Sequence, residues 1–198
     1  AKPIIGILGG GQLGMMLCDA AKKIDIETHI FCPEYDCPSK GRSTYFSVGD
    51  YNDKKEIIKF SNNVDYITYE FENIPIETID FITDQKKIRP GKKSLLLTQD
   101  RLTEKKFLDK LKVPIAPYKD LRTIDDISSA QNEFTDSIIK TRTLGYDGKG
   151  QFSLKESDDP NEVLNKIINN SIIEKRIPFE FEVSVIIARD IKGNTSFF

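Results

Sequence analysis

A cluster of glycines between an apolar run and an amphipathic run constrains the fold of this chain more than any other feature. Residues Ile4 to Leu8 are apolar and largely β-branched, which is typical of a buried strand. Glycines follow at Gly9, Gly11 and Gly14. Apolar side chains then recur at helical spacing, at Leu13, Met16, Leu17 and Ala20. The sequence therefore predicts a strand, a tight turn and a helix, the unit from which parallel sheets are built.

The following residues, up to Ile82, continue the same alternation. The predicted elements are a strand at Glu27 to Phe31, a helix at Asp53 to Phe60, a strand at Val64 to Thr68 and a short helix at Ile76 to Ile82. This order indicates an α/β fold, in which helices cover both faces of a parallel sheet. We place this first domain, of Rossmann-like type, at residues 1–95.

The second domain, at residues 96–198, has a different pattern. Asp100 is expected to cap a helix that runs to Leu111, and Val113 to Pro117 are expected to form an extended connector. The further predicted elements are a helix at Ile124 to Phe134, a strand at Ser137 to Thr141, a glycine-rich loop, a strand at Gln151 to Leu154, a helix from Pro160, strands at Ile172 to Lys175 and Glu182 to Ala188, a turn at Lys192 to Asn194 and a strand at Thr195 to Phe198.

Composition excludes several classes of protein. The chain has 29 basic and 31 acidic residues, a formal net charge of −2, and no block of one sign that would capture nucleic acid or a membrane surface. No apolar run approaches the roughly 20 residues that span a bilayer. Cys18, Cys32 and Cys37 cannot all pair, and the single histidine, His29, is too few for a zinc site. We therefore expect reduced thiols and a cytoplasmic location.

The glycine cluster satisfies the G-x-G-x-x-G pattern, which can bind a phosphate at a helix N-terminus. A dinucleotide site also needs an acid after the second strand, where Cys32 and Pro33 precede Glu34 and make the match poor. A P-loop does not fit, because Met15 and Met16 stand where Lys and Ser or Thr are required. A close turn of helix on strand without any ligand remains an alternative.

Two acids follow the predicted strand at 64–68. Glu70 and Glu72 should lie at its carboxyl end, beside the glycine turn, where open parallel sheets bind ligands. If the chain stays extended there, both carboxylates share one face and can accept hydrogen bonds from hydroxyls or an amine. A solvated acidic loop is the alternative.

The segment from Lys140 to Gln151 carries the strongest signal for a polyphosphate. Glycines at 145, 148 and 150 make a loop that can donate backbone N–H groups, and Lys140 on the preceding strand adds a point charge. A hairpin turn with a snorkelling lysine is the competing interpretation. Arg101, at the expected start of a helix, suggests an anion nearby, because a cation there is otherwise mildly unfavourable.

Together these segments resemble the ATP-grasp ligases, within them the family that carboxylates 5-aminoimidazole ribonucleotide in purine biosynthesis. The resemblance spans the whole chain, and it rests on GGGQLG at 9–14, YEFEN at 69–73, QDRLTEK at 99–105, KTRTLGYDGKGQ at 140–151 and FEFEVS at 179–184. It implies that bicarbonate, ATP and the ribonucleotide react to give ADP, phosphate and the N-carboxylated product. It also implies an incomplete ATP-grasp domain after the Rossmann-like domain.

The resemblance assigns roles to individual residues. The ATP contacts it implies are Arg101, Lys140, Gly145, Tyr146, Asp147, Gly148, Lys149, Gly150, Gln151, Glu174, Lys175, Arg176, Ile177 and Glu182. The ribonucleotide contacts it implies are Gln12, Leu13 and Glu70. Catalytic roles fall to Tyr146, Asp147 and Lys149, of which Asp147 would orient or deprotonate the amine. Met15 departs from the family, which often has arginine there.

The family's magnesium ligands are expected beyond residue 198, so this chain is expected to hold none and to be the N-terminal portion of a longer enzyme, inactive alone. The implied partners are the small-molecule substrates and a second copy in a homodimer, with no nucleic acid or membrane. Three alternatives remain: a formate-dependent glycinamide ribonucleotide ligase of the same superfamily, a nicotinamide-dependent oxidoreductase and a catalytically silent nucleotide-binding fragment.

Overall fold

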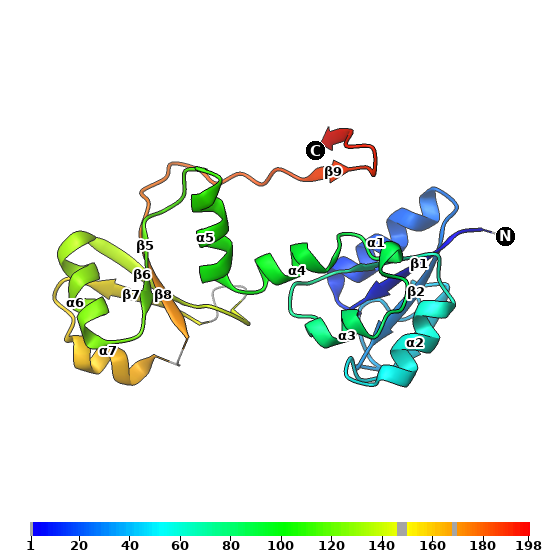
Figure 1. Cartoon of the computed structure of the whole chain (residues 1–198), viewed down its shortest axis with the longest axis horizontal. Helices are drawn as coiled ribbons and strands as arrows, with labels where there is room; N and C mark the ends of the chain where they lie inside the picture. Colours follow the sequence, from blue (N-terminus) through cyan, green and yellow to red (C-terminus); the bar gives the residue numbers. More distant parts are fainter. Residues whose placement is uncertain (1, 146–149, 168–169) are drawn as a thin grey trace.

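A computed structural model describes residues 2–145, 150–167 and 170–198. Figure 1 shows two lobes joined by helices α4 (Lys92–Thr98) and α5 (Arg101–Lys110). In the part of the chain that is described, no helix is both long and apolar enough to cross a membrane.

The first lobe is a parallel sheet of four strands in the order β3-β2-β1-β4. Its strands are β1 (Ile4–Leu8), β2 (Glu27–Cys32), β3 (Tyr45–Val48) and β4 (Tyr66–Tyr69). Its helices are α1 (Gln12–Lys23), α2 (Lys54–Asn62) and α3 (Ile76–Asp80), with a short 3-10 helix at Gln85–Lys87. The parallel α/β arrangement predicted from the alternation of elements is confirmed.

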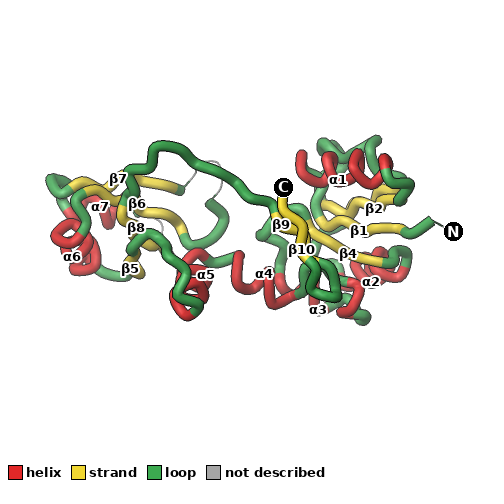
Figure 2. Tube along the Cα trace, turned by 90° about the horizontal axis from the view of Figure 1, so that it is seen from above, coloured by secondary structure: helices red, strands yellow, loops and turns green. Residues whose placement is uncertain are grey.

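Alternate residues of the strands serve the two faces of this sheet. Leu8 and Phe31 are buried with apolar side chains of α2, α3 and α4 in one cluster, whereas Ile7 and Ile30 are buried with Cys18 of α1 in another. Figure 2 shows α1 on one side of the sheet and α2 and α3 on the other. Helices therefore cover both faces, as the sequence predicted.

Helix α1 has the predicted position but shows the sheet a different face from the one that its apolar spacing suggests. Leu13 and Met16 are 58% and 60% exposed. The residues that α1 buries are small: Gly14, Cys18 and Ala21. Small side chains let the helix approach the strands closely, and the bulky apolar side chains are left on the outer surface.

The second lobe is an antiparallel sheet in the order β5-β8-β6-β7. Its elements are β5 (Tyr118–Leu121), α6 (Ile124–Glu133), β6 (Asp136–Thr141), β7 (Gln151–Lys155), α7 (Pro160–Lys166) and β8 (Ser171–Lys175). One face, with Ile139 and Ile173, is buried with residues of α6 and beneath α7. The other face carries polar side chains, and α5 lies against it through a hydrogen bond from the Tyr118 hydroxyl to Asp109 (2.6 Å).

The predicted strand at Glu182 to Ala188 is wrong over most of its length. A strand, β9 (Ile187–Arg189), begins only where β10 (Thr195–Phe197) is present to pair with it. The alternating apolar residues before Ile187 have no strand beside them among the residues described, and alternation alone cannot satisfy backbone hydrogen bonds. The predicted turn is confirmed, with Gly193 at φ +90°. Figure 1 shows this hairpin set apart from both lobes, and all residues from 177 to 198 are exposed.

Helix α4 spans the boundary that we predicted at residue 95. Leu95 is fully buried in the core of the first lobe. The Gln99 side-chain amide, just after α4, donates a hydrogen bond to the carbonyl oxygen of Ile74. Helix α4 is thus attached to the first lobe.

Candidate functional site

The glycine turn lies beside Glu70 because β1 and β4 are neighbours. Leu8 is paired with Tyr69, so Gly9 and Glu70 follow at the carboxyl ends of adjacent parallel strands. The amide of Glu70 continues the pairing by donating to the carbonyl oxygen of Leu8 at 3.1 Å. This is the position predicted from the sequence.

The carboxylate of Glu70 binds the start of helix α1. Its Oε1 accepts a hydrogen bond from the Gly11 amide at 2.6 Å, and its Oε2 accepts one from the Gly14 amide at 2.7 Å. Gly11 has no side chain to cap the helix, and the first turn of α1 contains no acid. Glu70 therefore satisfies two of the free N–H groups and places a negative charge at the positive end of the helix dipole.

The absence of side chains at Gly9 and Gly11 leaves space for this carboxylate. Gly9 has φ +114°, and a Cβ atom there would lie 2.3 Å from Cγ of Glu70. A Cβ on Gly11 would lie 2.7 Å from Oε1 of Glu70. Two of the N–H groups that a dinucleotide phosphate would use are already bonded to Glu70, so the turn does not favour the nicotinamide alternative.

The other residues predicted around this turn lie apart from the carboxylate. Gln12 and Leu13 are exposed in the first turn of α1. Glu72 does not share a face with Glu70, because β4 ends at Tyr69 and the chain then bends. Glu72 instead contacts the side-chain amide of Asn73 at 3.5 Å. The chain does not stay extended beyond β4, so the condition under which both carboxylates would share one face is not met.

A second cluster of charges occupies the polar face of the antiparallel sheet. Ile138 of β6 pairs with Glu174 of β8, so Lys140, two residues further along β6, is a diagonal neighbour of Glu174 on the same face. Lys140 Nζ lies 2.9 Å from Oε2 of Glu174. Lys105 of α5 lies 3.4 Å from Oε1 of the same carboxylate. Two ammonium groups thus share the single carboxylate of Glu174, which cannot neutralise both of them.

Burial makes this charge balance more important than it would be on the surface. The side chain of Lys105 is 13% exposed and that of Glu174 is 11% exposed. Interactions between charges are less screened at such positions than in bulk water. An anion near Lys140 would therefore interact strongly with its ammonium group.

Arg101 lies at the start of α5, as predicted, and fixes the loop that follows β6. Its guanidinium donates to the carbonyl oxygen of Thr141 at 2.7 Å and to that of Gly145. The Thr141 amide donates to the carbonyl oxygen of Gly150 at 3.0 Å. These bonds anchor both ends of the glycine-rich loop. Tyr146, Asp147, Gly148 and Lys149 lie outside the described residues.

Arg142, immediately after β6, fixes the same helix from the other side. It donates two hydrogen bonds to Asp100, at 2.9 and 2.6 Å, and Asp100 also accepts from the Thr103 amide at 2.9 Å. Burial on its own would raise the pKa of the Asp100 carboxyl, but the bonds from Arg142 and Thr103 hold that pKa below its usual range. Asp100 is therefore an ionised helix cap, as predicted, and it also binds Arg142.

The residues predicted to hold a nucleoside are only partly assembled around Glu174. The Lys175 amide donates to the carbonyl oxygen of Pro117 at 2.9 Å, and the Arg176 guanidinium contacts Asp136 at 2.8 Å. Ile177 and Glu182 are exposed, beyond the end of β8. Gly150, at φ +70°, and Gln151, the first residue of β7, lie beside the end of β6.

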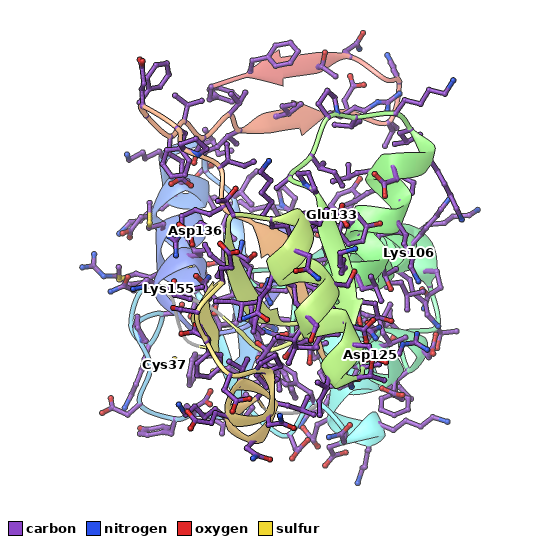
Figure 3. The ribbon with its side chains drawn as sticks, turned by 90° about the vertical axis from the view of Figure 1, so that its left-hand side faces the viewer. Cys37, Lys106, Asp125, Glu133, Asp136 and Lys155 are labelled. Atoms are coloured by element: carbon purple, nitrogen blue, oxygen red, sulfur yellow. The ribbon has the colours of Figure 1, made fainter. Side chains whose placement is uncertain are left out.

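Two residues of α5 belong to this cluster although the sequence analysis gave them no role. Lys105 shares Glu174 with Lys140, and burial raises the pKa of Glu104 although the nearby charges of Lys105 and Arg101 lower it. Lys106, the next residue, lies on the outer side of α5 (Figure 3) and is exposed. Two adjacent lysines on one helix therefore have different surroundings.

Among the described residues, no group of three or more His, Cys, Asp and Glu side chains is arranged to hold a metal ion. The described part of the chain therefore does not fit a magnesium site of its own. No step of the chemistry below is assigned to a metal bound by these residues.

Comparison with family models agrees with the division into two lobes. The ribonucleotide synthetase preATP-grasp domain matches residues 3–99, and the ATP-grasp domain matches residues 106–198. The chain belongs to the ATP-grasp superfamily. Within it, the chain is similar along its whole length to N-terminal portions of N5-carboxyaminoimidazole ribonucleotide synthases.

Individual relatives show the extent of this similarity. The synthase of Brucella melitensis is 39% identical over 203 residues, which cover 98% of this chain and 55% of that protein. The bifunctional purine synthesis protein purC/E of Dictyostelium discoideum is 40% identical over 195 residues, 96% of this chain and 20% of that protein. The crystal structure of the Staphylococcus aureus synthetase with ADP superposes with a TM-score of 0.91 at 33% identity, covering all of this chain (100%) and 54% of that one. The chain thus spans about half the length of the synthases that it matches.

Proposed function

We propose that this chain supplies the ribonucleotide-binding turn and one side of the ATP cleft of an N5-carboxyaminoimidazole ribonucleotide synthase. This enzyme would join bicarbonate to the amine of 5-aminoimidazole ribonucleotide and convert ATP to ADP and phosphate. The observation that carries the proposal is the cluster of Lys140, Lys105 and Glu174, in which two ammonium groups share one carboxylate, beside the anchored ends of the glycine-rich loop.

The charges suit phosphoryl transfer to bicarbonate. Bicarbonate is a poor electrophile, and its phosphorylation gives carboxyphosphate, which has a good leaving group. Lys140 would bind the phosphate oxygens of ATP, because an ammonium and backbone N–H groups stabilise charge on the phosphoryl group that is transferred. Arg101 would act mainly by holding the carbonyl oxygens of Thr141 and Gly145, and hence the ends of the loop, in position.

The glycine turn suits the ribonucleotide. Glu70 fixes the first turn of α1 through Gly11 and Gly14, and this presents the exposed Gln12 and Leu13 to the substrate. The amine of the ribonucleotide would then attack the activated carbon and lose a proton. We assign the orientation of that amine to Asp147, with Tyr146 and Lys149 beside the junction of the two substrates.

The wider assignments form part of the same proposal. Gly145, Gly148, Gly150 and Gln151 would bound the phosphates, and Glu174 to Ile177 and Glu182 would hold the nucleoside. Mg²⁺ would accompany ATP through ligands that the described residues do not supply. Free thiols at Cys18, Cys32 and Cys37 are in keeping with a cytoplasmic location.

A homodimer is also part of the proposal. The exposed apolar side chains of Met16 and Leu17 on α1 offer one surface for a second copy. Light scattering of the wild type and of Met16→Glu would test it. A dimer that persists in the variant would move the interface elsewhere, and a monomeric wild type would exclude the dimer.

The alternatives are separated by substrate. The matched relatives do not favour the formate-dependent glycinamide ribonucleotide ligase. In the enzyme that contains this chain, ADP release should require both bicarbonate and 5-aminoimidazole ribonucleotide. Equal turnover with formate and glycinamide ribonucleotide would contradict the proposal, and the absence of any ADP release would favour the catalytically silent protein.

Lys140→Ala tests the phosphate contact directly. Charge-assisted hydrogen bonds contribute about 1.5 to 3 kcal/mol, so we expect kcat/KM for ATP to fall by roughly ten-fold to a hundred-fold. Lys155→Ala is the matched control, because Lys155 is an exposed lysine on the adjacent strand β7 (Figure 3). Unchanged kinetics for Lys140→Ala would make this lysine a structural partner of Glu174 only.

A further inference from the structure

Two cysteines lie next to each other beneath the glycine turn. Cys32, the last residue of β2, is fully buried, and Cys37 is partly exposed in the loop that follows. Their sulfur atoms are 3.7 Å apart, and the Cys32 thiol lies 3.2 Å from the carbonyl oxygen of Glu34. Neither thiol has a role in the ligation proposed above.

The sulfur pair packs directly against the turn. A Cβ atom on Gly10 would lie 2.6 Å from each of the two sulfur atoms. The loop with Cys37 is also bonded to the turn, since the Ser39 amide donates to the carbonyl oxygen of Gly10 at 3.0 Å and its hydroxyl to that of Gly11 at 3.1 Å. A change in the bonding between the sulfurs would therefore be transmitted to Gly10 and Gly11.

We propose that Cys32 and Cys37 form a reversible disulfide, an oxidative modification site that acts on the glycine turn. A disulfide bond is about 2.05 Å long, so the sulfur atoms must move together from 3.7 Å. Rotation of the two side chains and adjustment of the short loop between them can provide this movement. The proposal does not depend on the function proposed above.

The reaction takes place with a low-molecular-weight disulfide as the oxidant. The Cys37 thiolate attacks one sulfur of the oxidant, forms a mixed disulfide and releases one thiol. The Cys32 thiolate then attacks the Cys37 sulfur and releases the second thiol. The two cysteines lose two protons and two electrons in total, and the oxidant is reduced to two thiols.

The surroundings of the two sulfurs set this order of attack. Cys37 is the one that a dissolved oxidant can reach. Burial, and after it the neighbouring Cys37, raises the pKa of the Cys32 thiol to about 12. Capping of Cys37 removes that second influence, so Cys32 becomes more reactive once the mixed disulfide has formed.

The sequence makes the product easy to detect. Trypsin cleaves after Lys23 and Lys40, so Cys32 and Cys37 occur in one peptide, residues 24–40. The disulfide form of this peptide is lighter by two hydrogen atoms and does not react with an alkylating reagent. Cys18 occurs in a separate peptide and serves as an internal control, because it is buried in α1 with no sulfur within bonding distance among the contacts described.

The experiment equilibrates the folded protein with a series of reduced-to-oxidised glutathione ratios, followed by acid quenching, alkylation in denaturant, trypsin and mass spectrometry. We expect peptide 24–40 to convert fully to the disulfide form at a ratio at least about tenfold more reducing than any that modifies Cys18. Returning the protein to reduced glutathione should restore both thiols. Cys37→Ser should leave Cys32 unmodified at every ratio.

Two results would overturn the proposal. One is peptide 24–40 with two alkylated thiols at every ratio. The other is oxidation of Cys18 and of peptide 24–40 at the same ratio, which would indicate unselective oxidation of an unfolded chain. A shift in the amide NMR signals of Gly10 and Gly11 on oxidation is the expected sign that the bond acts on the turn, and unchanged signals would limit the modification to the cysteine loop.

Discussion

Each lobe has a glutamate at the centre of its candidate site, Glu70 in the first and Glu174 in the second. The two lobes neutralise the charge of these carboxylates differently. Glu70 accepts hydrogen bonds from the backbone amides of Gly11 and Gly14, whereas Glu174 contacts the ammonium groups of Lys105 and Lys140. In the first lobe the carboxylate uses up the anion-binding capacity of the turn. In the second lobe the cations outnumber the carboxylate. Under the function proposed above, the first site therefore binds its substrate by its shape and the second by its charge.

Among the variants that test this comparison, Gly9→Ala should have the largest effect, which is on the stability of the first lobe. Gly9 has φ +114°, and an added Cβ atom would lie 2.3 Å from Cγ of Glu70. Backbone strain and displacement of Glu70 together should lower the free energy of unfolding by about 3 kcal/mol or more. Denaturant titration followed by circular dichroism measures this loss.

Gly41→Ala is the matched control for Gly9→Ala. Gly41 also has a positive φ, +77°, but a Cβ atom there would meet nothing within 4 Å. Its cost should be limited to about 1 to 2 kcal/mol of backbone strain. Equal losses in the two variants would mean that the approach of Glu70 contributes nothing to stability.

Glu70→Gln should have the next largest effect. The amide keeps one acceptor oxygen, removes the negative charge at the N-terminus of α1 and directs an NH₂ group at a backbone amide. We expect the free energy of unfolding to fall by about 2 kcal/mol. Glu72→Gln, two residues away, should change it little, since the hydrogen bond described for the Glu72 side chain, from Asn73 at 3.5 Å, is weak. A ribonucleotide KM that rises in Glu70→Gln while the ATP KM stays constant would also support the assignment of the two lobes.

Lys105→Met tests the contribution of the second ammonium group beside Glu174 in the second lobe. Without Lys105, Glu174 interacts with Lys140 alone, and Lys140 becomes a poorer ligand for phosphate. We expect the ATP KM to rise by roughly fivefold, about 1 kcal/mol, with the ribonucleotide KM unchanged. Lys105→Arg should recover most of the loss, and Lys106→Met should show none. An equal effect in Lys106→Met would contradict the role of Lys105 beside Glu174.

The smallest expected effect concerns His29 in the first lobe. We expect the interior of this lobe to disfavour a protonated, positively charged imidazole. Burial lowers the pKa of His29, and its Nε2 lies 2.8 Å from the Ser47 hydroxyl. The unfolded chain takes up its proton near pH 6.5, before the folded protein does. The stability that His29 provides is therefore fully present above pH 6.5 and is lost as the pH falls towards the lowered pKa of the folded state.

His29 is the single histidine of the chain, so NMR can follow its imidazole without assignment. We expect its midpoint below 6.5 in the folded protein. The free energy of unfolding should decline between neutral and mildly acidic pH, and this decline should be weaker in His29→Gln. A midpoint at or above 6.5 would show that the first lobe tolerates a buried cation after all.

The sequence predicted most of the first lobe because its central strand β1 is wholly apolar and β2 ends in the apolar run Ile30 to Cys32. Strands β1 and β2 are buried on both faces, and such runs are readily recognised. Strands β3 and β5 were missed, because they are short edge strands with few fully buried residues and no apolar run or regular alternation. Helix α4 was missed because Pro90 and Gly91 indicated a linker just before it.

The candidate site was predictable in its positions but not in its bonds. The rule for the carboxyl ends of parallel strands placed Glu70 beside the turn, yet no pattern could show that its two oxygens bind Gly11 and Gly14. Helical spacing alone also could not tell which of Lys105 and Lys106 faces Glu174, because adjacent helical residues differ in direction by about 100° and the position of α5 on the sheet was unknown.

The two hydrogen bonds to Glu70 also affect how fast the amides of the glycine turn exchange their hydrogens with water. Amides in the first turn of a helix normally have no partner within the helix and exchange their hydrogens with water quickly. The Gly11 and Gly14 amides instead donate hydrogen bonds to the carboxylate of Glu70, just after strand β4. Their hydrogens can exchange only when the end of β4 and α1 separate locally. The exchange rates of these two amides therefore report how often the turn opens.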